Sequence, residues 1–420
     1  MRIEIVTIGD ELLLGFTIDT NAAHVARELA AVGVEIVRRT TVGDTADMIV
    51  SAVSDALGRT GAVVTTGGLG PTSDDLTKAS IAALFGRRLT LNDGLVRRLR
   101  ERWALLRRDG DMPESNLVQA MVPEGAAILT NHHGTAPGIW LEDDRGLWTA
   151  MLPGVPREMR EMLRTELLPR VRERAAALEG RTPSVIQSRT LRTTGVAEST
   201  LADKLGALGR GVDGLALAFL PGVEGVDLRL TSRDLDADAA ESALSAGALK
   251  LRAAVGQYVY GVDDTDLAAV VLDLCREKGL RIAVAESCTG GMLGARITSI
   301  PGSSDVFVGG VIAYDNSVKT ELLGVRDEDL ARHGAVSEAV ARTMAREVRL
   351  RFAAEIGIAI TGVAGPGGGS PEKPVGTIWI AVDGPTVQSY CRQSFGSREE
   401  IRQRAAQAAL ETVRHALKTG

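Results

Sequence analysis

The sequence predicts an α/β protein built from three consecutive parts, and three observations predict it. The chain has 420 residues, a length that suggests two to three domains. In the first and last parts, short apolar runs alternate with stretches that carry apolar residues at helical spacing. Such alternation is typical of parallel sheets covered by helices. A Gly-Arg-Thr-Pro break at residues 180–183 then separates the first part from a smaller middle part.

The composition excludes several classes of protein. Lys and Arg number 48 against 54 for Asp and Glu, and this net charge of −6 argues against general affinity for nucleic acid. Cys275, Cys288 and Cys391 are odd in number and widely spaced, which predicts reduced thiols and a cytoplasmic location. We expect no signal peptide, and no uncharged apolar run approaches the ~20 residues of a membrane span.

The first part alternates strands with helices. Apolar runs predict strands at Ile3–Ile8, Val34–Val37 and Ala62–Thr66, and helical spacing predicts helices at Thr20–Ala31 and Ala46–Leu57. This order predicts a parallel sheet covered on both faces by helices. Ligands are then expected beyond the carboxyl ends of the strands.

Two polar clusters follow strands of this predicted sheet, at Gly9–Leu13 and Thr66–Asp75. Glycines followed by a hydroxyl let backbone amides approach phosphate oxygens; these residues are Gly67, Gly68, Gly70 and Thr72. Carboxylates at neighbouring strand ends could hold a hard divalent cation; these residues are Asp10, Glu11, Asp74 and Asp75. The alternative is a glycine-rich turn in which Asp74 or Asp75 caps a helix beginning near Thr77.

The middle part reads as a small α+β unit. Strands are predicted at Val185–Leu191, Leu215–Phe219 and Val226–Thr231, and helices at Ala197–Leu205 and Ala237–Ala254. In the first part, His24 is interpreted as structural, and His132 and His133 as solvent-facing or loop-stabilising. Adjacent side chains such as those of the two consecutive histidines point apart on an extended segment, which disfavours a shared metal.

The last part contains the most reactive cluster of side chains. A predicted strand at Arg281–Ala285 leads through a turn with Ser287 into a predicted helix at Met292–Ile300. We expect the helix start to leave N–H groups unpaired and to favour a developing alkoxide on the serine. The turn also carries Thr289, Gly290 and Gly291, which we expect to contact substrate.

A lysine 32 residues further on is a candidate base. Asp315 and Asn316 look like helix N-cap residues after the apolar run Val311–Tyr314, which puts Lys319 in the first turn of a helix. The helix dipole and partial burial would both lower the pKa of Lys319. The alternative is that Ser287 and Thr289 cap a helix and the lysine is a surface charge.

These residues carry a family resemblance. Five motifs, in this order, closely resemble the CinA-type nicotinamide mononucleotide amidase (deamidase) domain over residues 262–420: Ala285–Gly291, Pro301–Ser304, Tyr314–Lys319, His333–Ser337 and Thr361–Pro366. The resemblance implies hydrolysis of the carboxamide of nicotinamide mononucleotide to the acid, with release of ammonia and no cofactor.

Carried over by motif, Ser287 is the nucleophile, Lys319 the base and Tyr314 an assisting group. Thr361 and Arg398 match further active-site residues, and Gly365 lies in a glycine-rich loop, residues 362–376, expected to cover substrate. The rival hypothesis is a Cys–His amidase that uses Cys288 and His333.

The front of the chain resembles the molybdopterin-binding-type domain of full-length CinA proteins over residues 2–170. The motifs are Gly9–Leu13, Thr66–Asp75, Gly134–Gly138 and Leu152–Met159. The resemblance implies an ADP-ribose pyrophosphatase that uses magnesium, manganese or cobalt, with potassium as an optional addition. The alternative is a non-catalytic module that binds a pterin or nucleotide, or a competence-related scaffold.

The middle part resembles the KH-like domain of the same family. Gly211–Gly214 fits the Gly-x-x-Gly spacing of RNA-binding KH modules but carries Asp213, so we favour a structural linker. The expected domains are residues 1–170, 180–255 and 260–420. The family further implies a homodimer.

Overall fold

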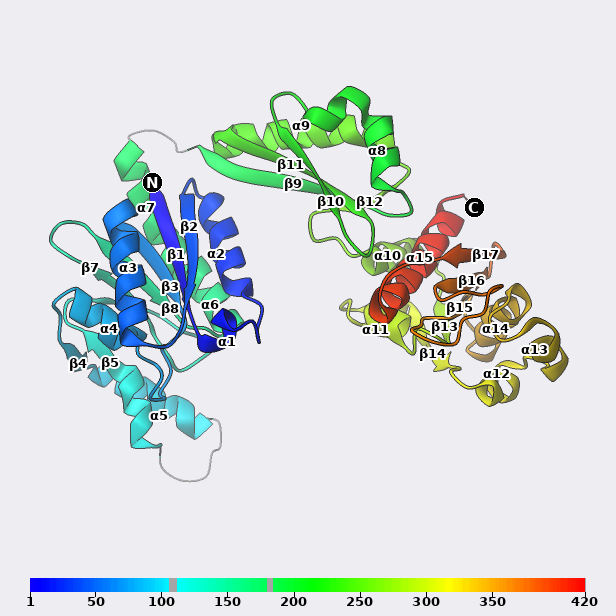
Figure 1. Cartoon of the computed structure of the whole chain (residues 1–420), viewed down its shortest axis with the longest axis horizontal. Coiled ribbons are helices and arrows are strands. Elements are labelled where there is room, and N and C mark those ends of the chain that lie inside the picture. The colour runs from blue at the N-terminus through cyan, green and yellow to red at the C-terminus, as the bar shows by residue number, and fades with distance from the viewer. Residues whose placement is uncertain (106–111, 180–183, 420) are drawn as a thin grey trace. The chain divides into compact units, whose positions relative to one another are not determined.

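A six-stranded sheet forms the centre of the front part of the chain in the computed structural model (Figure 1), which describes residues 1–105, 112–179 and 184–419. The strand order is β2-β1-β3-β8-β7-β6. The strands are β1 (Arg2–Ile8), β2 (Glu35–Val42), β3 (Ala62–Thr66), β6 (Ala127–Leu129), β7 (Gly138–Glu142) and β8 (Trp148–Leu152).

The parallel sheet predicted from the sequence is confirmed for four strands and extended by two antiparallel ones. β2, β1, β3 and β8 are parallel, whereas β6 pairs with β7, and β7 with β8, in antiparallel register. Only a few residues connect β7 to β8, and a parallel crossover needs a dozen or more. The sheet is therefore mixed.

Helices cover both faces of this sheet, as predicted. One apolar cluster joins Ile5 and Val64 to Val25 of α2 (Thr20–Ala30) and Met159 of α6 (Pro156–Met162). The other joins Val6 and Val63 to residues of α3 and α4. The remaining front elements are α1 (Asp10–Leu13), α3 (Ala46–Thr60), α4 (Thr77–Leu84), β4 (Leu89–Leu91), α5 (Asp93–Leu105), η1 (Glu114–Ala120), β5 (Met121–Pro123), the π-helix η2 (Leu163–Leu167) and α7 (Leu168–Glu179).

The middle part is a four-stranded antiparallel sheet with the order β10-β11-β9-β12, and helices pack on one face. Its elements are β9 (Val185–Thr193), α8 (Glu198–Leu205), η3 (Gly206–Arg210), β10 (Ala216–Pro221), β11 (Val226–Leu235), α9 (Ala237–Val255) and β12 (Val259–Val262). The last strand was not anticipated from the sequence. It is only four residues long, and antiparallel pairing with β9 places it in this sheet.

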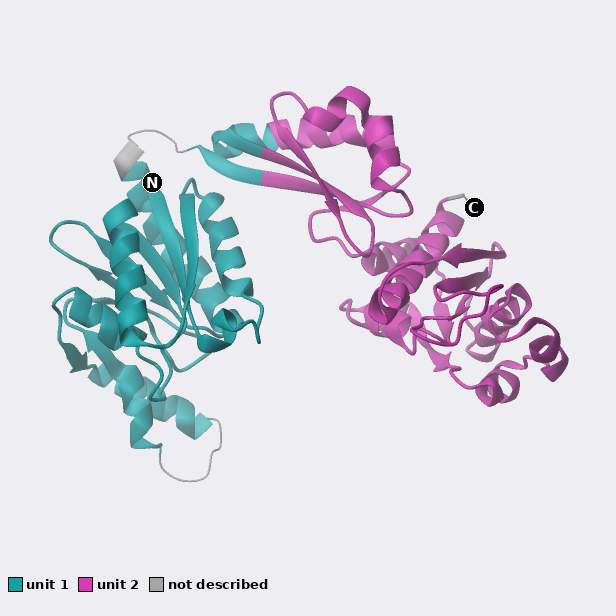
Figure 2. Cartoon of the chain, in the orientation of Figure 1, with its two compact units in different colours: residues 1–187, 232–242 teal, residues 188–231, 243–420 magenta. Residues whose placement is uncertain are grey.

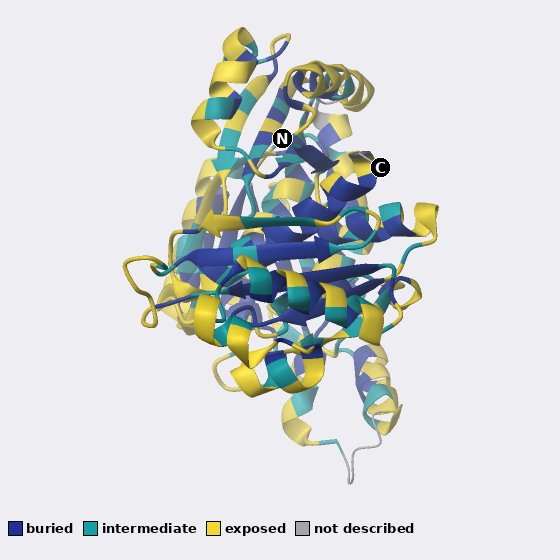
Figure 3. Cartoon of the chain, turned by 90° about the vertical axis from the view of Figure 1, so that its right-hand side faces the viewer, coloured by how far each residue is buried: buried dark blue, intermediate teal, exposed yellow. Residues whose placement is uncertain are grey.

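The last part is a five-stranded sheet with the order β14-β13-β15-β16-β17, buried on both faces. Its strands are β13 (Ile282–Glu286), β14 (Phe307–Ile312), β15 (Ile356–Gly362), β16 (Thr377–Asp383) and β17 (Gln388–Gln393). Its helices are α10 (Leu267–Lys278), α11 (Met292–Thr298), η4 (Ser303–Asp305), α12 (Asn316–Leu323), α13 (Asp327–His333), α14 (Glu338–Arg351) and α15 (Arg398–Thr419). In Figure 3 the central strands of the sheet facing the viewer are dark blue and the outer faces of its helices are yellow.

The chain forms two compact units, coloured separately in Figure 2: residues 1–187 with 232–242, and residues 188–231 with 243–420. The predicted break at residues 180–183 lies outside the described residues. The α/β class, with a small α+β middle and an α/β last part, is as the sequence predicts.

Candidate functional sites

Ser287 lies in the turn that joins β13 to α11, at the carboxyl end of a fully buried strand. Its backbone N–H donates to the carbonyl of Ile360 on the neighbouring strand β15 (2.9 Å), and its own carbonyl accepts from Gly290 (3.0 Å). The residue is 8% exposed. The turn therefore fixes the serine backbone beside the end of β15.

The expectation of unpaired N–H groups at the start of α11 is wrong. The carboxylate of Glu286, 1% exposed, accepts hydrogen bonds from the N–H groups of Gly291 (3.1 Å), Leu293 (3.0 Å) and Gly294 (2.8 Å). A negative charge at a helix start satisfies those donors and offsets the helix dipole. Ser287 thus receives less help from this helix than its position in the sequence suggested. Glu286 itself was missed, although a carboxylate ending an apolar strand before Gly-Gly was a usable signal.

Lys319 lies in α12, and its side chain is 1% exposed. Asp315 is the N-cap, as predicted, and its carboxylate accepts from the N–H of Ser317 (2.8 Å). The lysine Nζ donates to the carbonyls of Tyr314 (3.0 Å) and Asp315 (3.4 Å). Burial lowers the pKa of Lys319, and the negative charge of Asp315, together with that of Cys288 in its thiolate form, partly opposes that shift. Lys319 is therefore desolvated and close enough to Cys288 to interact with it electrostatically, and it is not the surface charge of the alternative reading.

Cys288 belongs to the hydrophobic core of the last part. Burial raises the pKa of its thiol to about 12. The nucleophilic form of cysteine is the thiolate, which such a pKa makes scarce at neutral pH. His333, the base of the rival hypothesis, is exposed at the end of α13. The structure thus favours the serine over the neighbouring cysteine.

Three predicted site residues meet at the start of α15. The Arg398 guanidinium donates to the Gly365 carbonyl and to the Tyr314 hydroxyl (3.0 Å for the latter). Tyr314 is 61% exposed, so its phenol meets Arg398 while its backbone carbonyl meets Lys319. Arg398 therefore connects the glycine-rich loop to the strand end that precedes α12.

The other predicted residues of this domain contribute through the backbone, except Thr361, which contributes through its hydroxyl. Gly290 and Gly291 adopt left-handed conformations, with φ of 60° and 93°, which favour glycine. The carbonyl of Thr289 accepts from Arg402 (2.7 Å), a residue that the sequence did not single out, while the Thr289 hydroxyl is buried with no partner among the described residues. Thr361 is buried and donates its hydroxyl to the Ala335 carbonyl (2.9 Å).

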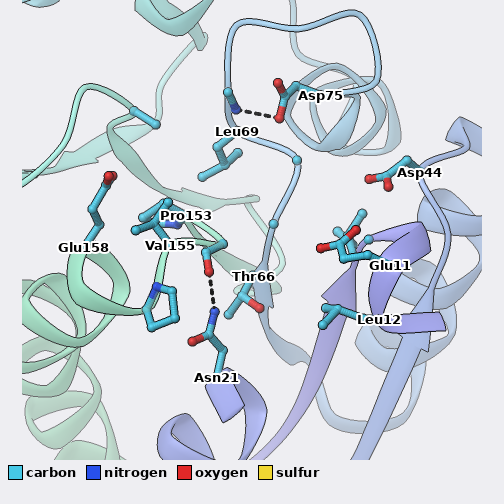
Figure 4. Close-up of a pocket in the computed structure, with 18 of the residues that line it drawn as sticks. Glu11, Leu12, Asn21, Asp44, Thr66, Leu69, Asp75, Pro153, Val155 and Glu158 are labelled. Carbon is cyan, nitrogen blue, oxygen red and sulfur yellow. Dashed lines mark hydrogen bonds between the residues drawn. The ribbon is translucent and has the colours of Figure 1, made fainter. Parts of the chain in front are cut away.

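A cleft of about 500 Å³ opens at the carboxyl ends of the front strands (Figure 4). Its lining includes the predicted glycines Gly67, Gly68 and Gly70. Six acidic residues also line it: Glu11, Asp19, Asp44, Asp74, Asp75 and Glu158. The cleft lies where the sequence predicted a ligand.

Asp75 shapes the glycine-rich loop. Its carboxylate accepts from the N–H of Gly70 (2.6 Å) and from both the N–H (2.8 Å) and the hydroxyl (2.6 Å) of Thr72. Neither Asp74 nor Asp75 caps α4, whose N-cap Leu76 has no side-chain hydrogen bond. A bond from the Thr72 side chain lowers the pKa of Asp74.

Asp10 is joined by two hydrogen bonds to Asp44, a residue that the sequence did not single out. Each aspartate accepts the backbone N–H of the other, at 2.9 and 3.2 Å. Burial, together with the charges of Asp10, Glu11 and Asp74, raises the pKa of Asp44. These four carboxylates therefore share one electrostatic environment.

The described residues contain no group of three or more His, Cys, Asp or Glu side chains arranged to hold a metal ion. Asp75 has both carboxylate oxygens engaged by its own loop. A Mg²⁺ ion that arrives with a diphosphate needs only one or two protein carboxylates. The carboxylates facing the cleft fit a metal ion that is bound together with a diphosphate. They do not fit a metal site built by the protein alone.

Two further cleft residues were missed. The Asn21 amide donates to the Gly154 carbonyl (2.7 Å), which ties α2 to the loop before α6. Glu158 accepts from Asn131 (2.7 Å) beside Gly134, where a Cβ would collide with it. Both side chains are labelled in Figure 4. Asn21 lies in none of the motifs identified in the sequence, and Glu158 lies within the Leu152–Met159 motif but was not identified as a site residue.

Comparison with known families accounts for nearly the whole chain. Residues 264–417 match the family described as "CinA C-terminal domain", residues 4–173 "Probable molybdopterin binding domain", and residues 188–261 "Damage-inducible protein CinA KH domain". A "CinA-like protein" of Gemmatimonas aurantiaca is 60% identical over 99% of this chain and 96% of its own length. Another, from Gloeobacter violaceus, is 43% identical over 98% and 95%.

A solved competence/damage inducible protein from Agrobacterium tumefaciens is 40% identical, covering 36% of this chain and 93% of its own, with a TM-score of 0.35. The matched families define a three-domain protein with a molybdopterin-binding-type front. The chain belongs to the CinA family. Among the described residues, no helix combines the length and apolarity that crossing a membrane requires. The homodimer and the cytoplasmic location stay predictions.

Proposed function

We propose that the last domain hydrolyses the carboxamide of nicotinamide mononucleotide to the acid and ammonia by a Ser–Lys mechanism. The observation that carries the proposal is Lys319. It is an amine with 1% exposure and a lowered pKa, and it interacts electrostatically with Cys288, the neighbour of Ser287 in the chain. A lysine serves as a general base when its environment favours the uncharged form.

In the proposed reaction, the Ser287 hydroxyl attacks the carboxamide carbon and its proton passes to the Lys319 amine. The proton then moves to the leaving nitrogen and the C–N bond breaks. Ammonia departs, and the acyl group remains on Ser287 as an ester. Water, deprotonated by the same amine, hydrolyses the ester and restores the serine. The N–H groups of Cys288 and Thr289, which donate to no backbone carbonyl in the described part of the chain, are the proposed donors to the developing oxyanion.

Ammonia release from nicotinamide mononucleotide tests the proposal. Ser287→Ala and Lys319→Ala are each expected to abolish release, while Cys288→Ala retains much of it. The cysteine variant is the matched control, because it alters the same turn without removing the proposed nucleophile. A folded but inactive Cys288→Ala enzyme would reverse the assignment.

The front cleft supports a second candidate, a metal-dependent ADP-ribose pyrophosphatase. The favouring observation is the cleft itself, where a glycine-rich loop stands opposite carboxylates. In this proposal the loop amides bind the diphosphate, and one or two carboxylates among Glu11, Asp44 and Asp74 would hold a divalent ion bound with it. That ion would neutralise phosphate charge when bound.

AMP release from ADP-ribose, with magnesium, manganese or cobalt and with or without potassium, tests this candidate. Removal of the metal with EDTA is expected to stop turnover. Nucleotide binding without AMP release would instead support the non-catalytic binding module.

A further inference from the structure

The middle domain sends one carboxylate to the helix that follows the Ser287 turn. Glu224 lies in the tight turn between β10 and β11, closed by a bond from Gly222 N–H to the Gly225 carbonyl (2.8 Å). Its carboxylate accepts from the Arg296 guanidinium of α11 at 3.0 Å. The Thr194 hydroxyl holds the Glu224 carbonyl (3.0 Å), so the backbone behind this carboxylate is fixed.

Glu224 belongs to a chain of alternating charges. Arg192 on β9 donates to Asp227 (3.0 Å) and to the other oxygen of Glu224 (3.1 Å). Arg296 in turn donates to Asp266 (3.1 Å), the N-cap residue of α10. The order is therefore acid, base, acid, base, acid, running from the middle sheet to two helices of the last domain.

Arg296 connects this network of ion pairs to the helix that follows the Ser287 turn. α11 begins directly after the Ser287 turn, and its first N–H groups are held by the Glu286 carboxylate. A shift of α11 would therefore move the Glu286–Gly291 segment. Arg296 is the side chain of that helix that the middle domain contacts through Glu224.

Burial makes this contact stronger than an ordinary surface ion pair. The Arg296 side chain is 14% exposed, and its Nη2 is buried with no partner among the described residues. Surface pairs contribute little, whereas removing one partner of a half-buried pair leaves the other charge desolvated. The Lys250–Asp213 pair of the same domain, 52% and 55% exposed, provides a contrast.

We propose that Glu224 is a positioning residue of the amidase site. The β10–β11 turn holds α11 through Arg296 and thereby sets the geometry of the Ser287 turn. This assigns the middle domain a mechanical role in the last domain. The expected effect on enzyme activity rests on the proposed amidase function, whereas the expected effect on the stability of α11 does not.

Amide hydrogen exchange and kinetics on the full chain test this role. Glu224→Gln keeps the shape of the side chain and removes its charge. We expect exchange in α11 to accelerate about five- to tenfold, and kcat for nicotinamide mononucleotide to fall by about the same factor with KM little changed. Glu224→Asp is expected to restore part of both. Asp213→Asn, in the exposed pair, is the matched control and should change neither.

The two proposals fail in different ways. A wild-type protein that releases no ammonia would refute the amidase function. Hydrogen exchange in α11 would still show whether the Glu224–Arg296 contact stabilises this helix. Unchanged exchange in Glu224→Gln would contradict the claim that Glu224 stabilises α11 through Arg296. Faster exchange with an unchanged kcat in an active enzyme would overturn the positioning role.

Discussion

Lys78 in the front domain and Lys319 in the last domain are both buried, with 2% and 1% exposure. Each lies near the start of a helix that follows a sheet strand, and each donates to backbone carbonyls. Burial is the main cause that lowers the pKa of both amines. By these local criteria the two lysines are equivalent.

Their surroundings differ. The Lys319 amine interacts electrostatically with Cys288, the residue that follows the proposed nucleophile Ser287. Lys78 instead donates to the Val118 carbonyl (2.6 Å) and fixes η1, whose Gln119 lines the front cleft. A lowered lysine pKa therefore identifies a candidate base only where a group that can give up a proton lies near the amine. The comparison predicts that one lysine governs turnover and the other governs stability.

The largest effect is expected at Lys319. Lys319→Met preserves the buried stem and removes the base, and it should lower kcat/KM for nicotinamide mononucleotide by about 10³-fold or more. In the wild type, kcat/KM should rise with pH and level off below the ordinary lysine range, because the uncharged amine is the active form and its pKa is lowered. Lys78→Met is the matched control and should keep the amidase activity. Equal losses in the two variants would erase the distinction.

Lys78 should reveal itself in stability against pH. Burial lowers its pKa from 10.5 to about 8. Between these two values the unfolded chain binds more protons, so the stability of the wild type rises with pH relative to Lys78→Met. Below pH 8 both states are protonated and the cost of burial is complete, at about 3 kcal/mol.

Scanning calorimetry of the front-domain transition from pH 7 to pH 10 measures this difference. The melting temperature of Lys78→Met should exceed that of the wild type at pH 7, and the gap should close as the pH rises. A gap that does not change with pH would mean that Lys78 is already uncharged at neutral pH or is not desolvated.

The sequence alone predicted more of the last domain than of the front site. Asp315 before a helix and an apolar strand before Ser287 are local patterns, and the cap, the strand and the helix all form as expected. Burial of Lys78 depends on η1, a segment some 40 residues away that packs over it, and no local pattern encodes that contact. The same applies to Glu224, whose partner Arg296 lies 72 positions later. Asp75 shows the limit of motif reasoning, because its carboxylate builds its own loop.

A smaller loss of stability is expected at Glu286. Glu286→Gln keeps one acceptor oxygen but sets an NH₂ donor against backbone N–H groups at the start of α11. The last domain should lose about 2 kcal/mol of unfolding free energy, measured by denaturant titration. Glu328→Gln alters an exposed acid in the first turn of α13 and should change stability by less than about 0.5 kcal/mol. Equal effects would mean that the buried contacts of Glu286 add nothing beyond a helix-end charge.

The smallest effect is expected at Tyr314, which carries two separate contacts. Its backbone carbonyl accepts from Lys319, and its exposed hydroxyl accepts from Arg398. Tyr314→Phe removes only the second contact, a bond of about 1 kcal/mol, so kcat/KM should fall roughly fivefold. The pH at which activity levels off should stay where it is, because the carbonyl that holds the lysine remains. A 10³-fold loss, or a displaced pH profile, would instead place the phenol in the proton path between the serine and the lysine. The buried amine would then share the role of base with the tyrosine.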